Sequence, residues 1–245
     1  MKHSFSILLV ILLLGGCTNT ASYSPVEEGR WQPHITQSGL YRVKEGDTLY
    51  SVAWAFGLDY RTLATINHLN PPYKIQANQL LHVKTVKRWT KAQTSAAQPY
   101  QIPITPVAIN SQPSSLYTRH KNREEKLHWS QPAKGRIIEH FNHWVGGNRG
   151  INIQGQYGEP IRAAASGIVV YSGAGVRGYG NLILIKHNDN YLSAYAFNKQ
   201  NLVKEGVSVH AGQEIAEMGR DDAGKIMLHF EIRYKGEPIN PLRYL

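Results

Sequence analysis

The chain of 245 residues holds one cysteine, Cys17, and no long hydrophobic run. A single cysteine cannot form an intrachain disulfide, so a fold stabilised by internal disulfide bonds is excluded. The longest apolar stretch runs from Phe5 to Leu14 and is interrupted only by Ser6. This stretch is too short for a membrane-spanning helix, which requires about 20 apolar residues. No heptad run indicates a coiled coil either.

The N-terminus has the pattern of an export signal. Lys2 precedes the apolar stretch, and Leu14-Gly15-Gly16-Cys17 ends it with small residues. The segment Leu-Gly-Gly-Cys resembles a bacterial lipobox, which implies a signal peptide over residues 1–16 and lipidation of Cys17. Lipidation would also remove an unpaired thiol from an oxidising compartment, and several acyl chains give stable anchoring. Thr18 favours the periplasmic face of the outer membrane by resemblance to sorted lipoproteins.

Acidic residues are scarce, with 17 Asp and Glu against 27 Lys and Arg, which gives a net charge of +10. The excess is concentrated in residues 85–128, where seven basic residues stand against two acidic ones. In a cell envelope, phosphate-bearing lipids and the carboxylates of peptide stems are the anionic surfaces such a segment can meet. A solvated linker rich in Lys and Arg explains the same composition. Nucleic acid is not expected as a partner of an exported, lipidated chain.

Two segments lack any sustained periodicity. Residues 17–39 read as a flexible stalk, and residues 85–128, which are rich in Pro and Ser, read as a linker. The linker composition cannot bury enough apolar surface to fold alone. Its ~44 residues would reach over 100 Å when stretched, at about 3.3 Å for each residue.

Residues 40–84 predict a β-α-α-β unit. A short alternating strand at Tyr41–Lys44 leads into the turn Glu45–Thr48, where Asp47 or Thr48 can cap a helix that ends at Gly57. A second helix is predicted from Tyr60 to Asn67, and the strand Leu80–Val83 closes the unit. The segment Val43-x-x-Gly46-Asp47-Thr48-Leu49, with Asn67 and Gln79-x-Leu81 following in order, resembles a LysM module. Ala77-Asn78 replaces the usual Pro-Gly, and Asn tolerates left-handed backbone geometry.

LysM modules bind glycans that contain N-acetylglucosamine, such as peptidoglycan. The resemblance places the groove between the loop at residues 46–49 and the segment from Asn67 to Ile75. The implied glycan-binding residues are Gly46, Asp47, Thr48, Leu49, Asn67, Tyr73 and Ile75. Some of these residues can instead serve only to cap helices and shape turns.

Residues 129–245 show an all-β pattern of short apolar runs separated by Gly-rich turns. The segments Asn148-Arg149-Gly150-Ile151-Asn152, Tyr195-Ala196-Phe197 and Leu228–Arg233 resemble the LytM-type (lysostaphin-like) peptidoglycan metallopeptidases. The fold class is therefore multidomain: a small α+β LysM module with β-α-α-β order, a Pro/Ser-rich linker, and a mostly-β LytM-type domain.

The LytM resemblance covers the scaffold but not the chemistry. The family's zinc ligands fall on Asn148, Asn152 and His229, and its assisting histidines fall on Phe197 and Met227, so one residue of five is retained. Zinc prefers imidazole, thiolate or carboxylate donors and needs about three of them at a hydrolytic site. Without zinc, nothing lowers the pKa of the attacking water toward about 7. We therefore expect no metal, no cofactor and no hydrolysis at this site.

The lipobox, the LysM module and the degenerate LytM domain together resemble the NlpD-type lipoproteins, in which the LytM domain activates N-acetylmuramoyl-L-alanine amidases that separate daughter cells. The resemblance implies that the former substrate groove docks an amidase and shifts it to an open state. Apolar and cationic side chains around the groove are then the candidate contacts. These candidates are Arg149, Tyr179, Phe197, Met227, His229 and Arg233.

Two other functions fit the same sequence. A zinc endopeptidase with substitute ligands would recruit from His140, His143, His187 and His210, although their spacing matches no known zinc triad. A wall-binding tether would use the LysM module and the lipid anchor without any protein partner. Phe197 and Met227 can also be ordinary core residues, and His229 an ordinary hydrogen-bonded strand residue.

Overall fold

The structure, a computed structural model, describes residues 39–83, 127–144 and 146–245. The predicted signal peptide (1–16) with Cys17, nearly all of the stalk (17–39) and nearly all of the linker (85–128) lie outside the described residues. All described residues belong to one compact unit. No helix within this described part has the length and apolar composition required to cross a membrane.

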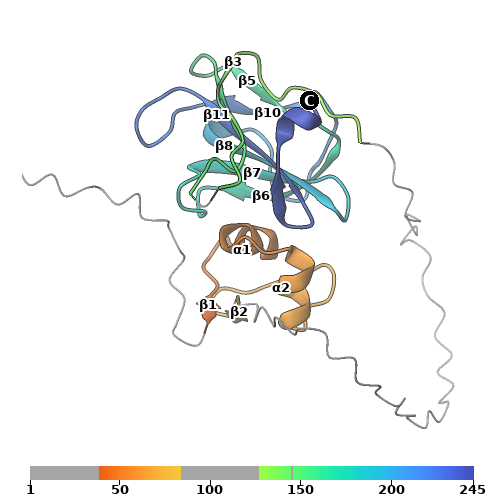
Figure 1. Cartoon of the computed structure of the whole chain (residues 1–245). Helices are drawn as coiled ribbons and strands as arrows, with labels where there is room; N and C mark the ends of the chain where they lie inside the picture. Colours follow the sequence, from red (N-terminus) through yellow and green to blue (C-terminus); the bar gives the residue numbers. More distant parts are fainter. Residues whose placement is uncertain (1–38, 84–126, 145) are drawn as a thin grey trace, which may run out of the picture. The chain divides into compact units, whose positions relative to one another are not determined.

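The N-terminal module has the predicted order of elements (Figure 1). Strand β1 (Leu40–Arg42) is followed by helices α1 (Leu49–Phe56) and α2 (Tyr60–Ile66) and by strand β2 (Leu80–His82). The two strands pair antiparallel, with Leu40 opposite His82. The β-α-α-β prediction is confirmed.

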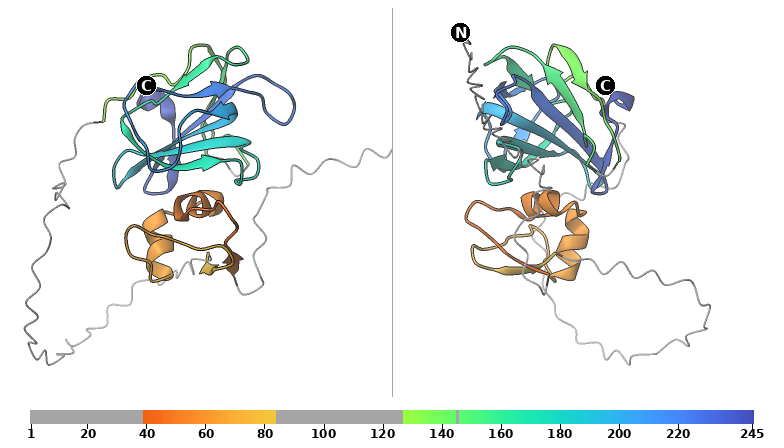
Figure 2. Two further views of the ribbon diagram at one scale, coloured as in Figure 1. Left: turned by 180° about the vertical axis from the view of Figure 1, so that it is seen from behind. Right: turned by 60° about the vertical axis from the view of Figure 1, so that its left-hand side comes forward.

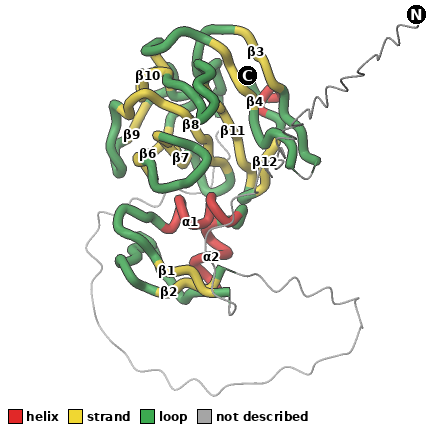
Figure 3. The backbone as a smooth tube through the Cα atoms, turned by 90° about the vertical axis from the view of Figure 1, so that its left-hand side faces the viewer, coloured by secondary structure: helices red, strands yellow, loops and turns green. Residues whose placement is uncertain are grey.

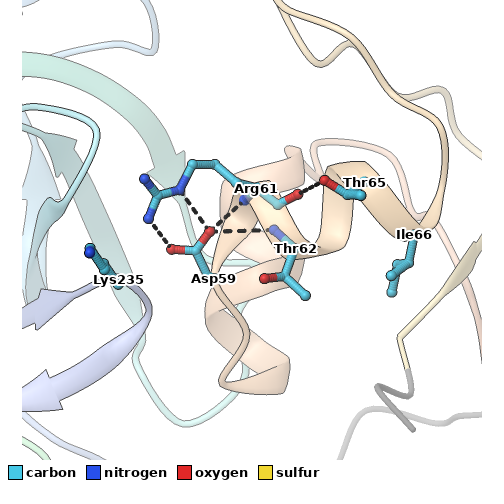
Figure 4. Close-up of a pocket in the computed structure, with 6 residues that line it drawn as sticks. All are labelled: Asp59, Arg61, Thr62, Thr65, Ile66 and Lys235. Carbon is cyan, nitrogen blue, oxygen red and sulfur yellow. Dashed lines mark hydrogen bonds and ion pairs between the residues drawn. The ribbon is translucent and has the colours of Figure 1, made fainter. Parts of the chain in front are cut away.

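Local chemistry fixes the ends of both helices. Thr48 forms a capping box with Ser51, because its side chain accepts a hydrogen bond from the Ser51 amide at 3.1 Å and the Ser51 hydroxyl accepts one from the Thr48 amide at 3.0 Å. Gly57 ends α1 in the left-handed conformation with φ 65°. Asp59 caps α2 and binds the Arg61 guanidinium at 2.8 Å (Figure 4). Asn78 has φ 70°, as its place in the Ala77-Asn78 turn predicted.

The C-terminal domain is built from antiparallel strands around one large sheet (Figures 2 and 3). Its elements are β3 (Arg136–Glu139), β4 (Ile151–Gln154), β5 (Pro160–Arg162), β6 (Gly167–Gly173), β7 (Asn181–Lys186), β8 (Tyr191–Asn201), β9 (Ser208–Val209), β10 (Glu214–Met218), β11 (Leu228–Tyr234), β12 (Glu237–Ile239) and the 3₁₀ turn η1 (Pro241–Arg243). The sheet order is β3-β4-β11-β8-β7-β6-β9, with β5, β10 and β12 attached beside it. The mostly-β prediction is confirmed.

Isoleucine-rich strands supply the core of this domain. Ile151, Ile153, Ile183 and Ile185 are almost completely buried and pack with Phe230 in one hydrophobic cluster. Burying a side chain of this size stabilises the fold by about 1.5–3 kcal/mol. The core therefore holds β4, β7 and β11 in fixed register, and this register determines which side chains meet at the candidate site.

A second hydrophobic cluster is shared by the LysM module and the LytM domain. Leu49 and Trp54 from α1 pack in the same cluster as Tyr171 from β6, Leu184 from β7 and Ala194 from β8. Helix α1 thus covers part of the large sheet. This cluster lies directly beside the candidate site.

Candidate functional site

Three adjacent strands bring the predicted site residues together. Asn152 on β4 lies opposite His229 on β11, and His229 in turn lies opposite Ala196 on β8. Phe197 follows Ala196, and its ring lies edge-on to the His229 ring at 6.2 Å between centroids. Three of the five positions that the resemblance assigned to the zinc site therefore meet at one place on the sheet.

A continuous hydrogen-bond network links these strands. The Asn152 amide nitrogen donates to Glu139 Oε2 at 2.5 Å, and Asn152 Oδ1 lies 2.7 Å from His229 Nδ1. His229 Nε2 lies 3.1 Å from Glu231 Oε1, which also accepts from the Tyr179 hydroxyl at 2.7 Å. The network thus runs from β3 through β4 and β11 to the turn before β7.

Both ring nitrogens of His229 face acceptors. Asn152 must present its oxygen to the ring because its nitrogen donates to Glu139, and a Glu231 carboxylate oxygen faces the other side. Each ring nitrogen therefore lies within hydrogen-bond distance of a neighbouring side chain. The side chain that the resemblance assigned as the one retained zinc ligand is thus engaged at both ring nitrogens by partners within the protein.

Glu231 and Arg233 form a buried ion pair next to His229. Arg233 Nε lies 3.1 Å from Glu231 Oε2, and their side chains are 1% and 0% exposed. Burial alone raises the pKa of the Glu231 carboxyl, but the Arg233 charge and the hydrogen bonds from His229 and Tyr179 outweigh it and lower the pKa to about 2. Burial and the nearby Glu231 carboxylate raise the pKa of Tyr179, so its hydroxyl stays a donor.

Asn148 and Met227 are the other two positions that the resemblance assigned to the zinc site. The Asn148 oxygen accepts from the Gly150 amide at 3.2 Å, and its amide nitrogen is buried without a hydrogen-bond partner. Met227 is 5% exposed. Phe197 has φ 62°, a left-handed conformation that is rare for an aromatic residue and costs energy. Two amides and one imidazole that is hydrogen-bonded at both nitrogens do not fit the donor set that Zn²⁺ requires.

The histidines considered as substitute ligands do not converge. His187 Nε2 bonds the Ser193 hydroxyl at 2.7 Å and its Nδ1 lies 2.8 Å from the Ser166 carbonyl oxygen. His143 stacks between the rings of Phe141 and Trp144. Across the described ranges, no group of three or more His, Cys, Asp or Glu side chains is arranged to hold a metal ion. His140 and His210 therefore belong to no such group either.

The six predicted amidase contacts differ in exposure, and their role stays a prediction. Arg149 is exposed, Tyr179, Phe197 and His229 are partly buried, and Met227 and Arg233 are buried. The cover over Arg233 is Trp54 of the LysM module, whose ring centroid lies 3.5 Å from the guanidinium carbon.

The predicted glycan-binding residues also have internal partners, and glycan binding by each of them stays a prediction. Asp47 accepts from the Tyr41 hydroxyl at 2.6 Å and from the Lys44 amide at 2.8 Å. Asn67 joins the end of α2 to β2 through bonds to Leu63 and His82. Thr48 caps α1, Leu49 is buried, and Gly46 has φ 81°. Tyr73 packs edge-on against Tyr50 and Tyr60, and Ile75 is half-buried beside the same cluster.

Sequence reasoning missed two features of the site. Glu139 reaches Asn152 only because β3 pairs with β4, and a register of this kind has no local signal in the sequence. Trp144, which is 73% exposed, lies in the loop between these strands together with Phe141 and His143. The aromatic run Phe141-Asn142-His143-Trp144 is the signal that could have revealed this loop.

Comparison with known proteins identifies both domains. Residues 41–84 match the LysM domain, and residues 146–241 match peptidase family M23. A Pseudomonas aeruginosa protein named lipoprotein NlpD/LppB homolog is 41% identical over 85% of this chain and 77% of its own length. The murein hydrolase activator NlpD of Escherichia coli is 39% identical over 87% of this chain and 69% of its own length.

A third relative matches the chain from end to end. It is the Escherichia coli protein named uncharacterized lipoprotein YgeR, which is 40% identical over 100% of this chain and 94% of its own length. The relatives carry lipoprotein names, which indicates a location in the cell envelope. The LysM and M23 matches and the extent of these alignments show that the chain belongs to the NlpD family of lipoproteins.

Proposed function

We propose that this protein binds peptidoglycan through its LysM module and activates N-acetylmuramoyl-L-alanine amidases through its LytM domain, without cleaving peptidoglycan itself. The family name of its relatives, murein hydrolase activator, supports this proposal. In the cell the activity would promote hydrolysis of septal peptidoglycan and separation of daughter cells.

The observation that carries the proposal is the pair of hydrogen-bond partners at the His229 ring. Its two ring nitrogens lie 2.7 Å from Asn152 Oδ1 and 3.1 Å from Glu231 Oε1, so both are engaged by hydrogen-bond partners within the protein. Asn148 and Asn152 add only amides, which are poor donors for zinc. This donor set supports a site that does not activate water, within a β-sheet that keeps its packing.

A mixing assay tests the proposal directly. Labelled peptidoglycan sacculi are incubated with the full chain alone, with a purified amidase alone and with both together. We expect release of label by the mixture well above the amidase alone, and no release by the chain alone. Release by the chain alone, together with stoichiometric zinc in metal analysis, would support the endopeptidase alternative. If the chain stimulates no periplasmic amidase, the result would favour a wall-binding tether without a protein partner.

Charge reversal at Arg149 probes the docking face with a matched control. Arg149 is exposed beside the site, so Arg149→Glu should weaken stimulation of the amidase if an acidic surface docks there. Arg162 is also exposed but lies on β5, where it bonds the Gly212 carbonyl. Arg162→Glu should leave stimulation unchanged. Equal effects of both variants would argue against docking at this face.

We also propose that Cys17 carries the lipid that anchors the protein at the periplasmic face of the outer membrane. The lipoprotein names of the relatives support an anchor, and the choice of membrane depends on Thr18 alone. Labelling of cells with radioactive palmitate should mark the protein. Cys17→Ser should abolish the label and release the chain from the membrane fraction, and separation of inner and outer membranes would show where the wild type resides.

A further inference from the structure

The LytM face proposed for amidase docking is already covered by helix α1 of the LysM module. The Arg233 guanidinium stacks on the Trp54 ring at 3.5 Å, and Arg233 Nη1 donates to the Trp54 carbonyl oxygen at 3.1 Å. The Trp54 ring also meets the Tyr179 ring edge-on at 6.5 Å. Arg233 is left only 1% exposed, so a partner protein cannot reach it in this arrangement.

The same contact engages the predicted glycan groove of the LysM module. The Thr48 hydroxyl, on one wall of that groove, donates to the Val170 carbonyl oxygen of β6 at 3.1 Å. On the other wall, Tyr73 packs against Tyr60, and Lys186 of the LytM domain lies 5.9 Å from the centre of the Tyr60 ring. A sugar that paired with Thr48 would have to displace Val170.

The hairpin between β11 and β12 approaches α2 as closely as the backbone allows. A Cβ atom at Gly236 would lie 2.6 Å from the Asp59 nitrogen and 2.7 Å from its Cα. The neighbouring Lys235 lines a pocket with Asp59, Arg61 and Ile66 (Figure 4). No side chain larger than hydrogen fits at position 236 while this contact is closed.

We propose that the LysM module and the amidase compete for one face of the LytM domain, and that glycan binding to the LysM module opens this face. This inference rests on the proposed function, because the amidase is the second ligand. In the closed state Trp54 covers Arg233, and the Val170 carbonyl oxygen accepts the hydrogen bond of the Thr48 hydroxyl. The protein would therefore activate an amidase chiefly where peptidoglycan holds the LysM module away from the sheet.

Competition of this kind has a quantitative signature. If both ligands bind only the open state, each apparent affinity is reduced by the same factor, the open fraction. A substitution that opens the contact without touching either binding site then raises both affinities by one common factor. By linkage, a saturating glycan should raise the affinity for the amidase in the wild type by up to the same factor.

Gly236→Asn is the opening variant, and Gly206→Asn is its matched control. Both glycines have φ +84°, a conformation that Asn tolerates, so the backbone penalty is equal. A Cβ at Gly236 collides with the Asp59 backbone, whereas nothing lies within 4 Å of a Cβ at Gly206. Neither glycine belongs to the predicted glycan-binding set or to the predicted amidase contacts.

The experiment measures three properties of the full chain and both variants. Small-angle X-ray scattering gives the radius of gyration, calorimetry gives the affinity for the N-acetylglucosamine pentamer, and fluorescence anisotropy gives the affinity for a labelled amidase. We expect Gly236→Asn to increase the radius of gyration and to raise both affinities by the same factor, about tenfold if one molecule in ten is open. Gly206→Asn should match the wild type in all three.

The possible failures point to different parts of the argument. An unchanged radius of gyration in Gly236→Asn, or an opened chain with unchanged affinity for the pentamer, would overturn the inference and leave the proposed function intact. A higher affinity for the pentamer in Gly236→Asn alone, with no amidase binding by any variant, would overturn the proposed function and support the occlusion of the LysM groove. An equal gain in Gly206→Asn would show that the contact is not the cause.

Discussion

Replacing the buried Glu231 carboxylate by an amide should destabilise the LytM domain strongly. Glu231 is 0% exposed and holds together Arg233, His229 and the Tyr179 hydroxyl. In Glu231→Gln the Arg233 charge remains buried without its counter-charge, and the new amide hydrogens face groups that are themselves donors.

The size of the effect follows from the pKa of Glu231. The structure lowers it from 4.5 to about 2. At about 1.4 kcal/mol for each tenfold change in proton affinity, the folded state favours the ionised form by about 3 kcal/mol. Because the folded pKa is depressed, this stability is complete above pH 4.5 and is lost as the pH falls toward 2.

Urea unfolding of the full chain, followed through the β-sheet signal in circular dichroism, measures this effect. Glu231→Gln should be about 3 kcal/mol less stable than the wild type at pH 7, and the difference should shrink between pH 4.5 and 2. Glu214→Gln, at an exposed ion pair with Arg162, should change stability little. Equal stabilities at pH 7, or a difference that stays constant down to pH 2, would refute the role given to the ion pair.

Three further substitutions test other parts of the structure. Burial lowers the pKa of His187 to about 4. The stability that its neutral ring contributes is therefore complete above pH 6.5 and is lost as the pH falls to 4. His187→Gln should weaken this pH dependence of the free energy of unfolding, measured in urea. Asn67→Ala removes two hydrogen bonds to His82 of β2 and one to Leu63 of α2, and should destabilise the LysM module by about 2 kcal/mol in thermal unfolding, whereas the exposed Asn70→Ala should not. Thr48→Val removes the cap of α1 and should cost about 1 kcal/mol, with little effect of Thr62→Val on the surface of α2.

The fold could be predicted from the sequence because its signals are local. The capping residue Thr48 and the terminating Gly57 mark the ends of α1 within a few residues. The apolar runs Asn181–His187 and Gly167–Tyr171 fall on β7 and β6, because buried antiparallel strands need these residue types. Strand β8 extends beyond its apolar part and continues past Tyr195 to Asn201.

The site could be predicted only in part. The motif at Leu228–Arg233 placed His229 and Arg233 on one strand, and the family resemblance assigned Asn148 and Asn152 to the same site. The bond from Asn152 to Glu139 depends on the pairing of β3 with β4, and that pairing is a long-range contact without local signal. The left-handed backbone of Phe197 also had no sequence signal, since an aromatic residue normally avoids that conformation.

The contact between Trp54 and Arg233 shows why exposure was harder to predict than position. Tyr179, Phe197 and Arg233 have the aromatic and cationic character of residues that dock a partner, and the sequence therefore indicated a surface that is covered at some stage. The same composition suits a cover that is part of the chain, because α1 presents an indole ring to the guanidinium across 179 residues of sequence. Composition alone cannot distinguish a surface covered by a partner protein from one covered by helix α1 of the same chain. If both use one face, each must leave before the other binds, and the strength of the internal contact sets how readily the amidase is activated.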